Sequence, residues 1–341
     1  MLFDRCLNGS DAALLAGATE NFLPRRVFDI HAHVSHPDFY QRCNLPALLS
    51  NVKYDAACHR DDMALLLGTG RVEGSLFFGF PSRDNDRPGV NGWLLSELRQ
   101  PHRESHDRGL VLAAPSDDRD EVERLLGSGH FSGIKPYHIY AGPADTTQAN
   151  IQDFTPEWMW QACHQHKGIL MLHLVKDAAV SDPNNRRALR ELCEKYPDCR
   201  VVLAHVARAF NYRTARGLKD VSMLPNVFVD TSAVTEAEAI RTAIEILGIE
   251  RVLYGSDYPI SHVRGRCVST GLTFRWLYAD EQSRNDMTLV GIESLLCLRE
   301  AAESLHLTAP EIERIFYHNA VELLGNRTPG PDGGAVAALT E

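Results

Sequence analysis

Short runs of apolar and β-branched residues recur along the chain, each about as long as a β-strand. Segments typical of helices separate these runs. The runs cover residues 27–34, 72–80, 109–115, 132–137, 168–175, 200–206, 226–232 and 251–257. The pattern therefore predicts eight strands that alternate with helices.

Capping residues mark the starts of several intervening helices. Thr155-Pro156 and Asp182-Pro183 each have the form of an N-cap residue followed by a proline in the first turn. Thr235 and Glu238 have the spacing of a capping box, in which each side chain bonds the other residue's backbone N–H. Thr308 and Glu311 have the same spacing. These signals place helix starts just after residues 155, 182, 235 and 308.

Eight strands alternating with helices over about 300 residues is the arrangement of a closed (β/α)₈ TIM barrel. A doubly wound open sheet would give the same alternation, but no G-x-G-x-x-G turn follows the first strand. Long connections follow the first strand (35–71) and the eighth strand (258–285), both at the C-terminal face of a barrel. We expect an N-terminal segment packed on the barrel (1–26), the barrel itself (27–325) and a flexible tail (326–341).

Composition and charge narrow the range of partners. The formal net charge is −10 and the pI is near 5.8, so no net basic field attracts nucleic acid or an anionic membrane. No apolar run approaches the ~20 residues that a membrane span needs. The eight cysteines include no CxxC pair, which favours reduced thiols in a cytoplasmic protein.

Metal-ligand residue types stand at the ends of several predicted strands. The first strand ends in His31 and His33, the fifth in His173, the sixth in His205 and the eighth in Asp257. In a barrel these ends point at one mouth, so the side chains are expected to converge. Residues at i and i+2 on a strand share a face, so the first two histidines can both point inward. Imidazole with carboxylate suits zinc, manganese, iron or nickel.

The chain contains its own control for this spacing. "CHQHKG" sets His164 and His166 one residue apart, but inside the helix predicted before the fifth strand. Two such residues on a helix lie ~200° apart and cannot bind one ion. The position at a strand end, rather than the spacing, therefore indicates the metal site.

The motifs at these positions resemble those of the amidohydrolase superfamily of metal-dependent TIM barrels. The resemblance is strongest to the amidohydrolase-related (amidohydrolase 2) branch, which also contains lactonases and non-oxidative decarboxylases. It rests on "DIHAHV", "GIKPY", "LMLHL", "VVLAHVAR", "LYGSDYP" and "HNAVELL", which together span residues 27–324. The resemblance thus covers nearly the whole chain.

The resemblance implies a role for each strand-end residue. His31, His33, His173 and Asp257 would bind the principal divalent metal, Zn²⁺ or alternatively Mn²⁺. His205 would bind a second metal, or in mononuclear relatives polarise the substrate or move protons. Asp257 would also be the general base toward metal-bound water, so that Asp257 and His205 are the implied catalytic residues.

Lys135, at the end of the fourth strand, has two readings. In binuclear relatives this lysine is carboxylated and bridges two metals; in mononuclear relatives it either faces the substrate or braces the site. The neighbouring motifs favour one ion. We also expect Tyr137, Arg208, His262 and Arg264 to contact substrate, and Arg208 could grip a carboxylate bidentately. A salt bridge at a helix start is the alternative for Arg208.

The sequence therefore predicts a hydrolase whose metal-activated water cleaves a C–N or C–O bond of a small, anionic amide, lactone or ester. The alternative is non-oxidative decarboxylation of an aromatic or unsaturated carboxylic acid at the same site. A metal-free barrel kept for binding or scaffolding is a third hypothesis, against which the intact ligand set argues. The expected partner is a small-molecule substrate, and analogy with relatives, often dimers or larger, leaves a homo-oligomer open.

Overall fold

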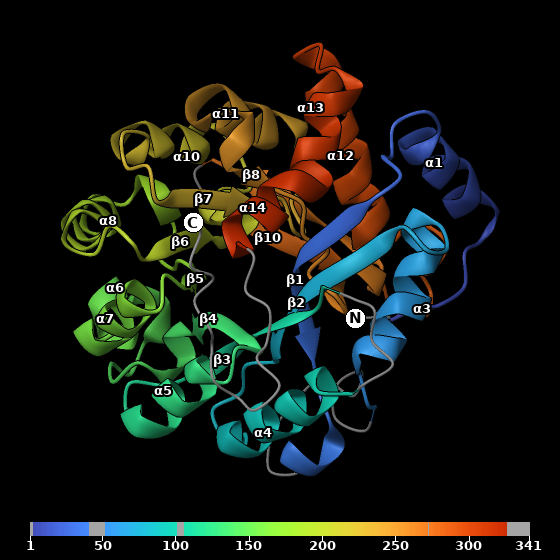
Figure 1. The fold of residues 1–341 in the computed structure, drawn as a ribbon. Coiled ribbons are helices and arrows are strands. Elements are labelled where there is room, and N and C mark those ends of the chain that lie inside the picture. The colour runs from blue at the N-terminus through green and yellow to red at the C-terminus, as the bar shows by residue number, and fades with distance from the viewer. Residues whose placement is uncertain (1–2, 41–51, 101–105, 272, 326–341) are drawn as a thin grey trace, which may run out of the picture.

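The structure is a computed structural model that describes residues 3–40, 52–100, 106–271 and 273–325. All eight predicted strands are present, and they form one parallel sheet in sequence order (Figure 1). Their bounds are β1 Val27–Val34, β2 Val72–Gly79, β3 Arg108–Ala113, β4 Phe131–Pro136, β5 Ile169–Leu172, β6 Arg200–Leu203, β7 Val227–Asp230 and β8 Val252–Leu253.

The backbone after β8 closes the sheet onto β1. The Ile30 N–H donates to the Tyr254 carbonyl (3.1 Å), and the His33 N–H donates to the Tyr258 carbonyl (2.8 Å). In the other direction, the Asp257 N–H donates to the His31 carbonyl (2.9 Å). The predicted (β/α)₈ barrel is therefore confirmed, and its closing seam runs through candidate ligands.

Helices surround the barrel on the outside (Figure 1). The α-helical segments are α1 Gly9–Thr19, α3 Ala56–Leu67, α4 Arg87–Leu98, α5 Arg119–Gly127, α6 Ile151–Phe154, α7 Glu157–Gln165, α8 Pro183–Lys195, α9 Ala204–Arg208, α10 Tyr212–Ala215, α11 Ala237–Leu247, α12 Val290–Ser304, α13 Ala309–Glu313 and α14 Asn319–Leu324. Shorter turns are η1 Pro37–Phe39, η2 His138–Tyr140, η3 Thr146–Gln148, η4 Ala179–Ser181, η5 Arg216–Val221, η6 Ile249–Arg251, η7 Ile260–His262 and the π-helical η8 Arg314–His318.

Two layers of buried side chains lie on opposite faces of the strands. Alternate strand residues, such as Phe28 and Met171, form a cluster inside the barrel, while their neighbours pack outward under the helices. α14 lies across one end of the barrel and adds Leu323 to the inner cluster (Figure 1). The Asn319 amide on this helix donates to the carbonyls of Ile249 and Val252. α14 therefore closes that end of the barrel.

The two long connections carry structure of their own. The connection after β1 contains α3, although its residues 41–51 lie outside the described residues. The connection after β8 contains an antiparallel hairpin of β9 (Gly265–Thr270) and β10 (Thr273–Tyr278). In the N-terminal segment, α1 packs on α12. The expected tail over 326–341 also lies outside the described residues.

Two of the four predicted helix caps are confirmed. Thr308 and Glu311 form the expected capping box at the start of α13. Asp182 caps α8 and accepts from the N–H groups of the next turn. Thr155 does not cap α7, because Pro156 occupies the N-cap position and the Thr155 hydroxyl donates to the Ile151 carbonyl. The capping box at Thr235 is also wrong: its hydroxyl donates to the Cys267 carbonyl, and α11 begins two residues later.

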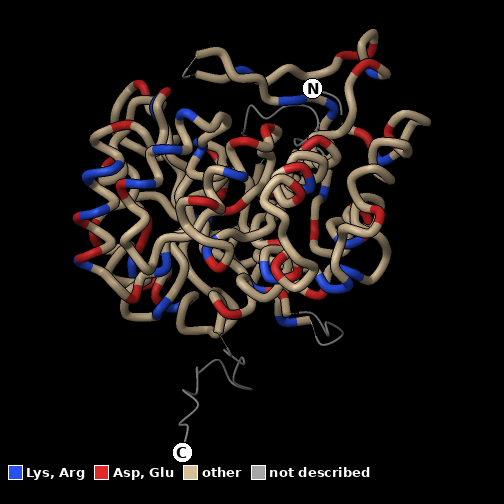
Figure 2. Tube along the Cα trace, turned by 90° about the horizontal axis from the view of Figure 1, so that it is seen from above, with Lys and Arg blue, Asp and Glu red and all other residues tan. Residues whose placement is uncertain are grey.

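Acidic and basic residues are interspersed along the chain trace (Figure 2). All seven cysteines among the described residues are free thiols. None of the helices in the described part of the chain combines the length and apolar character needed to cross a membrane.

Candidate metal centre

A bulge in β1 directs both of its histidines into the barrel. The pairing register with β2 shifts between Asp29 and Ala32. Ile30 belongs to the cluster inside the barrel and Ala32 to the cluster outside it. The extra residue of a bulge therefore lets Ile30 and His31 face inward in succession, and His33 follows on the same side.

His31 and His33 meet Asp257 from the far side of the seam. Asp257 Oδ1 lies 3.3 Å from His31 Nε2 and 3.2 Å from His33 Nε2. His31 Nε2 is buried and has no hydrogen-bond partner, although a carboxylate oxygen is near. Ligand atoms of these three residues lie within 4.8 Å of one another. Two imidazoles and a carboxylate face one point, and one ring nitrogen that could coordinate a metal has no hydrogen-bond partner. This arrangement fits a divalent metal ion.

Asp230, at the end of β7, orients this group. Its Oδ2 lies 2.9 Å from His31 Nδ1, and its Oδ1 accepts from the His205 N–H (2.9 Å). Burial opposes its ionisation, but His31 and His205 outweigh burial and lower its pKa. A proton held on His31 Nδ1 by this carboxylate leaves Nε2 free as a ligand. Sequence reasoning missed Asp230, although it follows the inward-facing Phe228 by two residues.

His205 sits in a left-handed turn rather than on a strand. β6 ends at Leu203, short of the predicted residue 206, and φ is between 51° and 58° from His205 to Arg208. Such angles cost non-glycine residues about 1–2 kcal/mol each and are typical of functional sites. His205 Nδ1 donates to the Ser232 carbonyl (2.9 Å), which leaves Nε2 available to the mouth.

His173 lies beside the cluster. It follows β5 and is half-buried, and its ring centre is 5.2 Å from that of His205 and 5.9 Å from that of His138. Its Nδ1 has no hydrogen-bond partner. Burial, reinforced by the charge of His205, lowers its pKa well below the ordinary value, so the imidazole is neutral and competent as a ligand.

Lys135 is fully buried next to these histidines. Its Nζ has no hydrogen-bond partner and lies 4.9 Å from the ring centres of both Phe78 and Tyr137. Burial lowers its pKa to about 7. The Tyr137 hydroxyl in turn lies 3.5 Å from His33 Nε2. Both residues therefore face the candidate metal centre.

Arg208 lies at the rim of the site, at the end of the left-handed turn. Its guanidinium donates to the Lys176 carbonyl (2.9 Å) and lies over the Phe274 ring at 4.9 Å. Among the described residues it forms no salt bridge, so the helix-start ion pair is not observed. Its planar donors remain open to a substrate carboxylate.

The structure does not bring His262 and Arg264 to the site. His262 is fully buried, with its ring nitrogens bonded to Ser261 and to the Asp62 carbonyl. Arg264 is 1% exposed, and its guanidinium binds Asp4 and Asp11 of the N-terminal segment. These contacts replace the substrate-binding role expected for both residues, because neither side chain reaches the mouth.

A second buried network, also missed in the sequence, fixes the segment that carries Asp257. Asp29 accepts from His59 Nε2 (2.8 Å) and from the Ser256 N–H (2.9 Å). The Ser256 hydroxyl also donates to Asp29. Asp29 points outward from β1, so this network links the first strand, α3 and the turn after β8 from behind the site.

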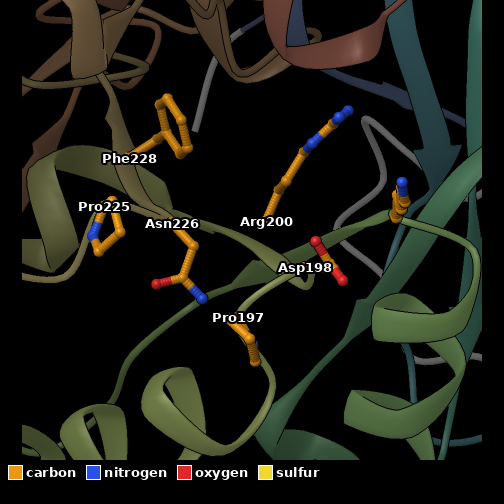
Figure 3. A pocket seen from close by; sticks show the side chains of 7 residues that line it. Pro197, Asp198, Arg200, Pro225, Asn226 and Phe228 are labelled. Carbon is orange, nitrogen blue, oxygen red and sulfur yellow. The ribbon is translucent and has the colours of Figure 1, made fainter.

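A hollow of about 220 Å³ lies at the opposite end of the barrel, where β6 and β7 begin (Figure 3). Two of its polar side chains, Arg200 and Asn226, are already bonded. Arg200 donates to the Leu323 carbonyl, and the Asn226 amide donates to the carbonyls of Cys193, Tyr196 and Cys199. This hollow is therefore framed by structural contacts and is separate from the metal centre.

Comparisons with known proteins identify the family and the fold. A sequence model of the amidohydrolase (amidohydrolase 2) family matches residues 28–325, whereas no curated protein is similar enough in sequence to match. A zinc-bound amidohydrolase from Burkholderia multivorans is 16% identical, with 88% of this chain and 99% of that chain covered and a TM-score of 0.57. The 5-carboxyvanillate decarboxylase of Sphingomonas paucimobilis is 15% identical, with the same coverage and a TM-score of 0.55.

A third similar structure, from Pseudomonas putida, is described as a 2-pyrone-4,6-dicarboxylic acid hydrolase. It is 17% identical, with 89% of this chain and 98% of that chain covered and a TM-score of 0.53. At such identities the likeness to solved structures shows the shared fold. The family match extends over most of the chain, and the protein belongs to the amidohydrolase family, as an enzyme of the amidohydrolase superfamily.

Proposed function

We propose that this enzyme is a metal-dependent hydrolase that cleaves a C–N or C–O bond of a small anionic substrate. One observation carries the proposal: buried His31 Nε2, without a hydrogen-bond partner, faces Asp257 while Asp230 holds the other ring nitrogen. His31, His33, His173 and Asp257 would hold one divalent ion. The zinc bound to the similar Burkholderia multivorans structure supports Zn²⁺ ahead of Mn²⁺.

A divalent ion bound here would lower the pKa of a coordinated water toward ~7 and polarise a substrate carbonyl. Asp257 can accept a proton. Burial alone would raise its pKa, but His205, His31 and His33 hold it well below the ordinary value. His205 can exchange a proton or bind the substrate through Nε2, since its Nδ1 is engaged by Ser232. These two residues are the proposed catalytic pair.

Cationic side chains beside the histidines support an anionic substrate. Lys135 lies inside the site and Arg208 at its rim, and neither has a carboxylate partner among the described residues. Tyr137 adds a hydroxyl next to His33. We assign these three residues to substrate binding, with Arg208 as the bidentate partner of a carboxylate.

Decarboxylation of an aromatic or unsaturated acid is the second candidate function. Two decarboxylases share the fold, one acting on 5-carboxyvanillate and one, from Rhizobium, on 2,6-dihydroxybenzoate. Aromatic side chains also lie next to the site, where the Phe210 ring stacks on His205 with centres 6.0 Å apart. Both reactions would use the same ligands and the same cationic residues.

Elemental analysis of protein purified without chelator tests the metal centre. We expect about one equivalent of zinc or manganese, held tightly because the site buries its ligands. A content below a few tenths of an equivalent, not restored by either ion, would overturn the proposal. Intact-mass measurement would reveal a carboxylated Lys135 and hence a two-metal site.

A substrate panel separates the two reactions. Small carboxylated lactones, esters and amides would be followed for new carboxylate groups, and aromatic acids for released CO₂. Hydrolysis without CO₂ supports the first candidate, and CO₂ release without hydrolysis supports the second. A metal-loaded enzyme inactive on both sets would contradict the assignment of an anionic substrate.

A further inference from the structure

The exposed face of α1 carries no charge. Apolar residues occur all round this helix, and Asp11, its one charged residue, is buried. Apart from two glycines, the exposed residues are Ser10, Ala12, Ala13, Leu14 and Ala16. α1 packs on α12 at the outside of the molecule, so that one side of it is covered (Figure 1). Because a helix that is apolar all round is typically buried all round, the open face of α1 is expected to have a partner.

A groove of about 380 Å³ lies between α1 and the β9–β10 hairpin. Leu14 forms part of one wall, and Leu277 of β10 forms part of the other. These two are 40% and 45% exposed, and they are two of the three large apolar side chains that are exposed in the described part of the chain. Exposed apolar side chains scattered singly are ordinary, but side chains that gather in one hollow indicate an interaction site.

The Arg264 guanidinium joins the two walls of the groove. Asp11, which lines the groove from α1, accepts from Arg264 Nη2 (2.6 Å) and from the Thr288 hydroxyl (2.7 Å). Arg264 directly precedes β9, and its carbonyl accepts from the N–H of Ala279, just after β10 (3.0 Å). All four residues are buried. The groove is therefore already formed in the single chain, which reduces the conformational entropy lost when a partner binds.

Unpaired charges of opposite sign flank the groove. Arg275 is exposed and lies on the same side of β10 as Leu277, since residues two apart on a strand share a face. Asp286 lines the groove from the loop after the hairpin and is also exposed. Neither forms a salt bridge with any residue that the structure describes, whereas Arg266 in the same groove pairs with Glu293 (3.2 Å). A face with one unpaired charge of each sign is complementary to a second copy of itself.

We infer that this face binds a second copy of the chain in a two-fold symmetric dimer. A two-fold contact uses the same face of both copies, so a protruding helix and a groove side by side on one face complete each other. α1 of each copy lies in the groove of the other, with Leu14 and Leu277 at the centre. Arg275 of each copy faces the partner's Asp286. The inference goes beyond the proposed function and does not depend on the reaction at the metal centre.

Sedimentation equilibrium of the full-length protein over a range of concentrations tests the dimer. We expect a species with twice the chain mass of 38.0 kDa. Leu14→Glu and Leu277→Glu each place a charge at the centre of the contact, so each should raise the dimer dissociation constant at least about a hundredfold. Both side chains are exposed in the single chain, and the circular dichroism spectra of the variants should match that of wild type.

Met223→Glu is the matched control. Met223 is 79% exposed and lies outside the groove, so the same kind of substitution should leave the dimer dissociation constant within about twofold of wild type. A protein that is monomeric at every concentration would overturn the inference. So would a dimer that Met223→Glu weakens as much as the two groove variants do, or one that both groove variants leave intact.

Reversal of the two flanking charges tests whether the partner is a second copy in the two-fold arrangement. Arg275→Glu and Asp286→Arg should each weaken the dimer about tenfold, because each sets like charges opposite one another. The double variant restores opposite charges in both halves of the contact, so its dissociation constant should return to within about threefold of wild type. A double variant that dimerises no more tightly than the single variants would overturn the two-fold arrangement.

Discussion

Two buried clusters of charged residues follow β8, and they differ in how completely their polar atoms are paired. The Arg264 guanidinium donates to the carboxylates of Asp4 and Asp11 and to two backbone carbonyls. Each of its three nitrogens has a partner. The side chains of Arg264 and Asp11 are both 1% exposed, so this is a fully satisfied buried ion cluster.

The cluster around Asp257 is also largely buried but is incompletely bonded. His31 Nε2, His33 Nδ1, His173 Nδ1 and Lys135 Nζ are buried atoms without a hydrogen-bond partner. An unsatisfied buried polar atom costs about 1–3 kcal/mol, and four in one place are expected only where a ligand completes them. The two clusters thus differ in how completely their polar atoms are paired: the Arg264 cluster is satisfied internally, and the Asp257 cluster leaves four atoms for a ligand.

The largest effect is expected from Asp257→Asn. The amide cannot accept the proton that we assign to this carboxylate, so kcat/KM on the substrate found in the panel should fall by about 10⁴-fold, the upper range for a lost general base. The circular dichroism spectrum should be unchanged. Asp280→Asn, at an exposed aspartate after β10, should keep wild-type activity. Near-full activity of Asp257→Asn would remove the base assignment.

Arg264→Ala should act on stability instead. Removing the cation leaves Asp11 buried without a cationic partner and leaves Asp4 with Arg284 alone. Breaking a buried ion cluster in this way costs about 3–5 kcal/mol. Urea unfolding measures this loss. Arg266→Ala is the matched control: its guanidinium is half-exposed and pairs with Glu293, so it should cost less than about 1 kcal/mol. Zinc content per folded Arg264→Ala molecule should equal that of wild type. Loss of zinc would show that the Arg264 cluster and the metal centre are coupled and do not act independently.

Much of the barrel could be predicted from the sequence because its signals are local. Each strand is a short apolar run between helices. His173 directly follows β5 and Asp257 lies in the turn after β8, and the convergence of these two strand ends follows from the fold. The bulge in β1 left no such signal. All eight residues of "VFDIHAHV" are buried, so no alternation of polar and apolar residues shows where the register shifts.

The remaining features depend on contacts between distant residues. Arg264 was placed at the mouth because it follows the eighth strand, but its partners lie more than 250 residues earlier. Asp230, at the end of β7, acts through His31 on β1, which lies 199 residues earlier in the chain. The left-handed turn after β6 contains no glycine, the residue that usually indicates such backbone angles, so the sequence "HVAR" does not predict it. Position along the chain therefore predicted the candidate ligands and missed the residues that hold them in place.

Metal loading should stabilise the protein without involving the Arg264 cluster. At a free zinc concentration a hundredfold above its dissociation constant, bound metal adds about 2.7 kcal/mol to the free energy of unfolding. Thermal unfolding of chelator-stripped and reloaded protein measures this as a zinc-dependent rise in Tm. The Arg264→Ala variant should gain the same increment, because the two clusters share no side chain. A Tm independent of zinc in both proteins would contradict a native metal centre.

The smallest effect, and the one that most sharpens the comparison, is expected from Asp230→Asn. Asp230 touches no substrate in our assignment; it holds His31 Nδ1 so that Nε2 faces the ion. Losing such a support weakens metal binding about tenfold, which competition with a chromophoric chelator would measure.

The matched control is Asp62→Asn, a buried aspartate that bonds the Tyr258 hydroxyl and contacts no candidate ligand. Its variant should lose stability and keep zinc affinity within about twofold. Equal losses of zinc affinity in both variants would mean that these buried carboxylates affect zinc binding only through the stability of the protein. Asp230 would then have no specific role in orienting His31.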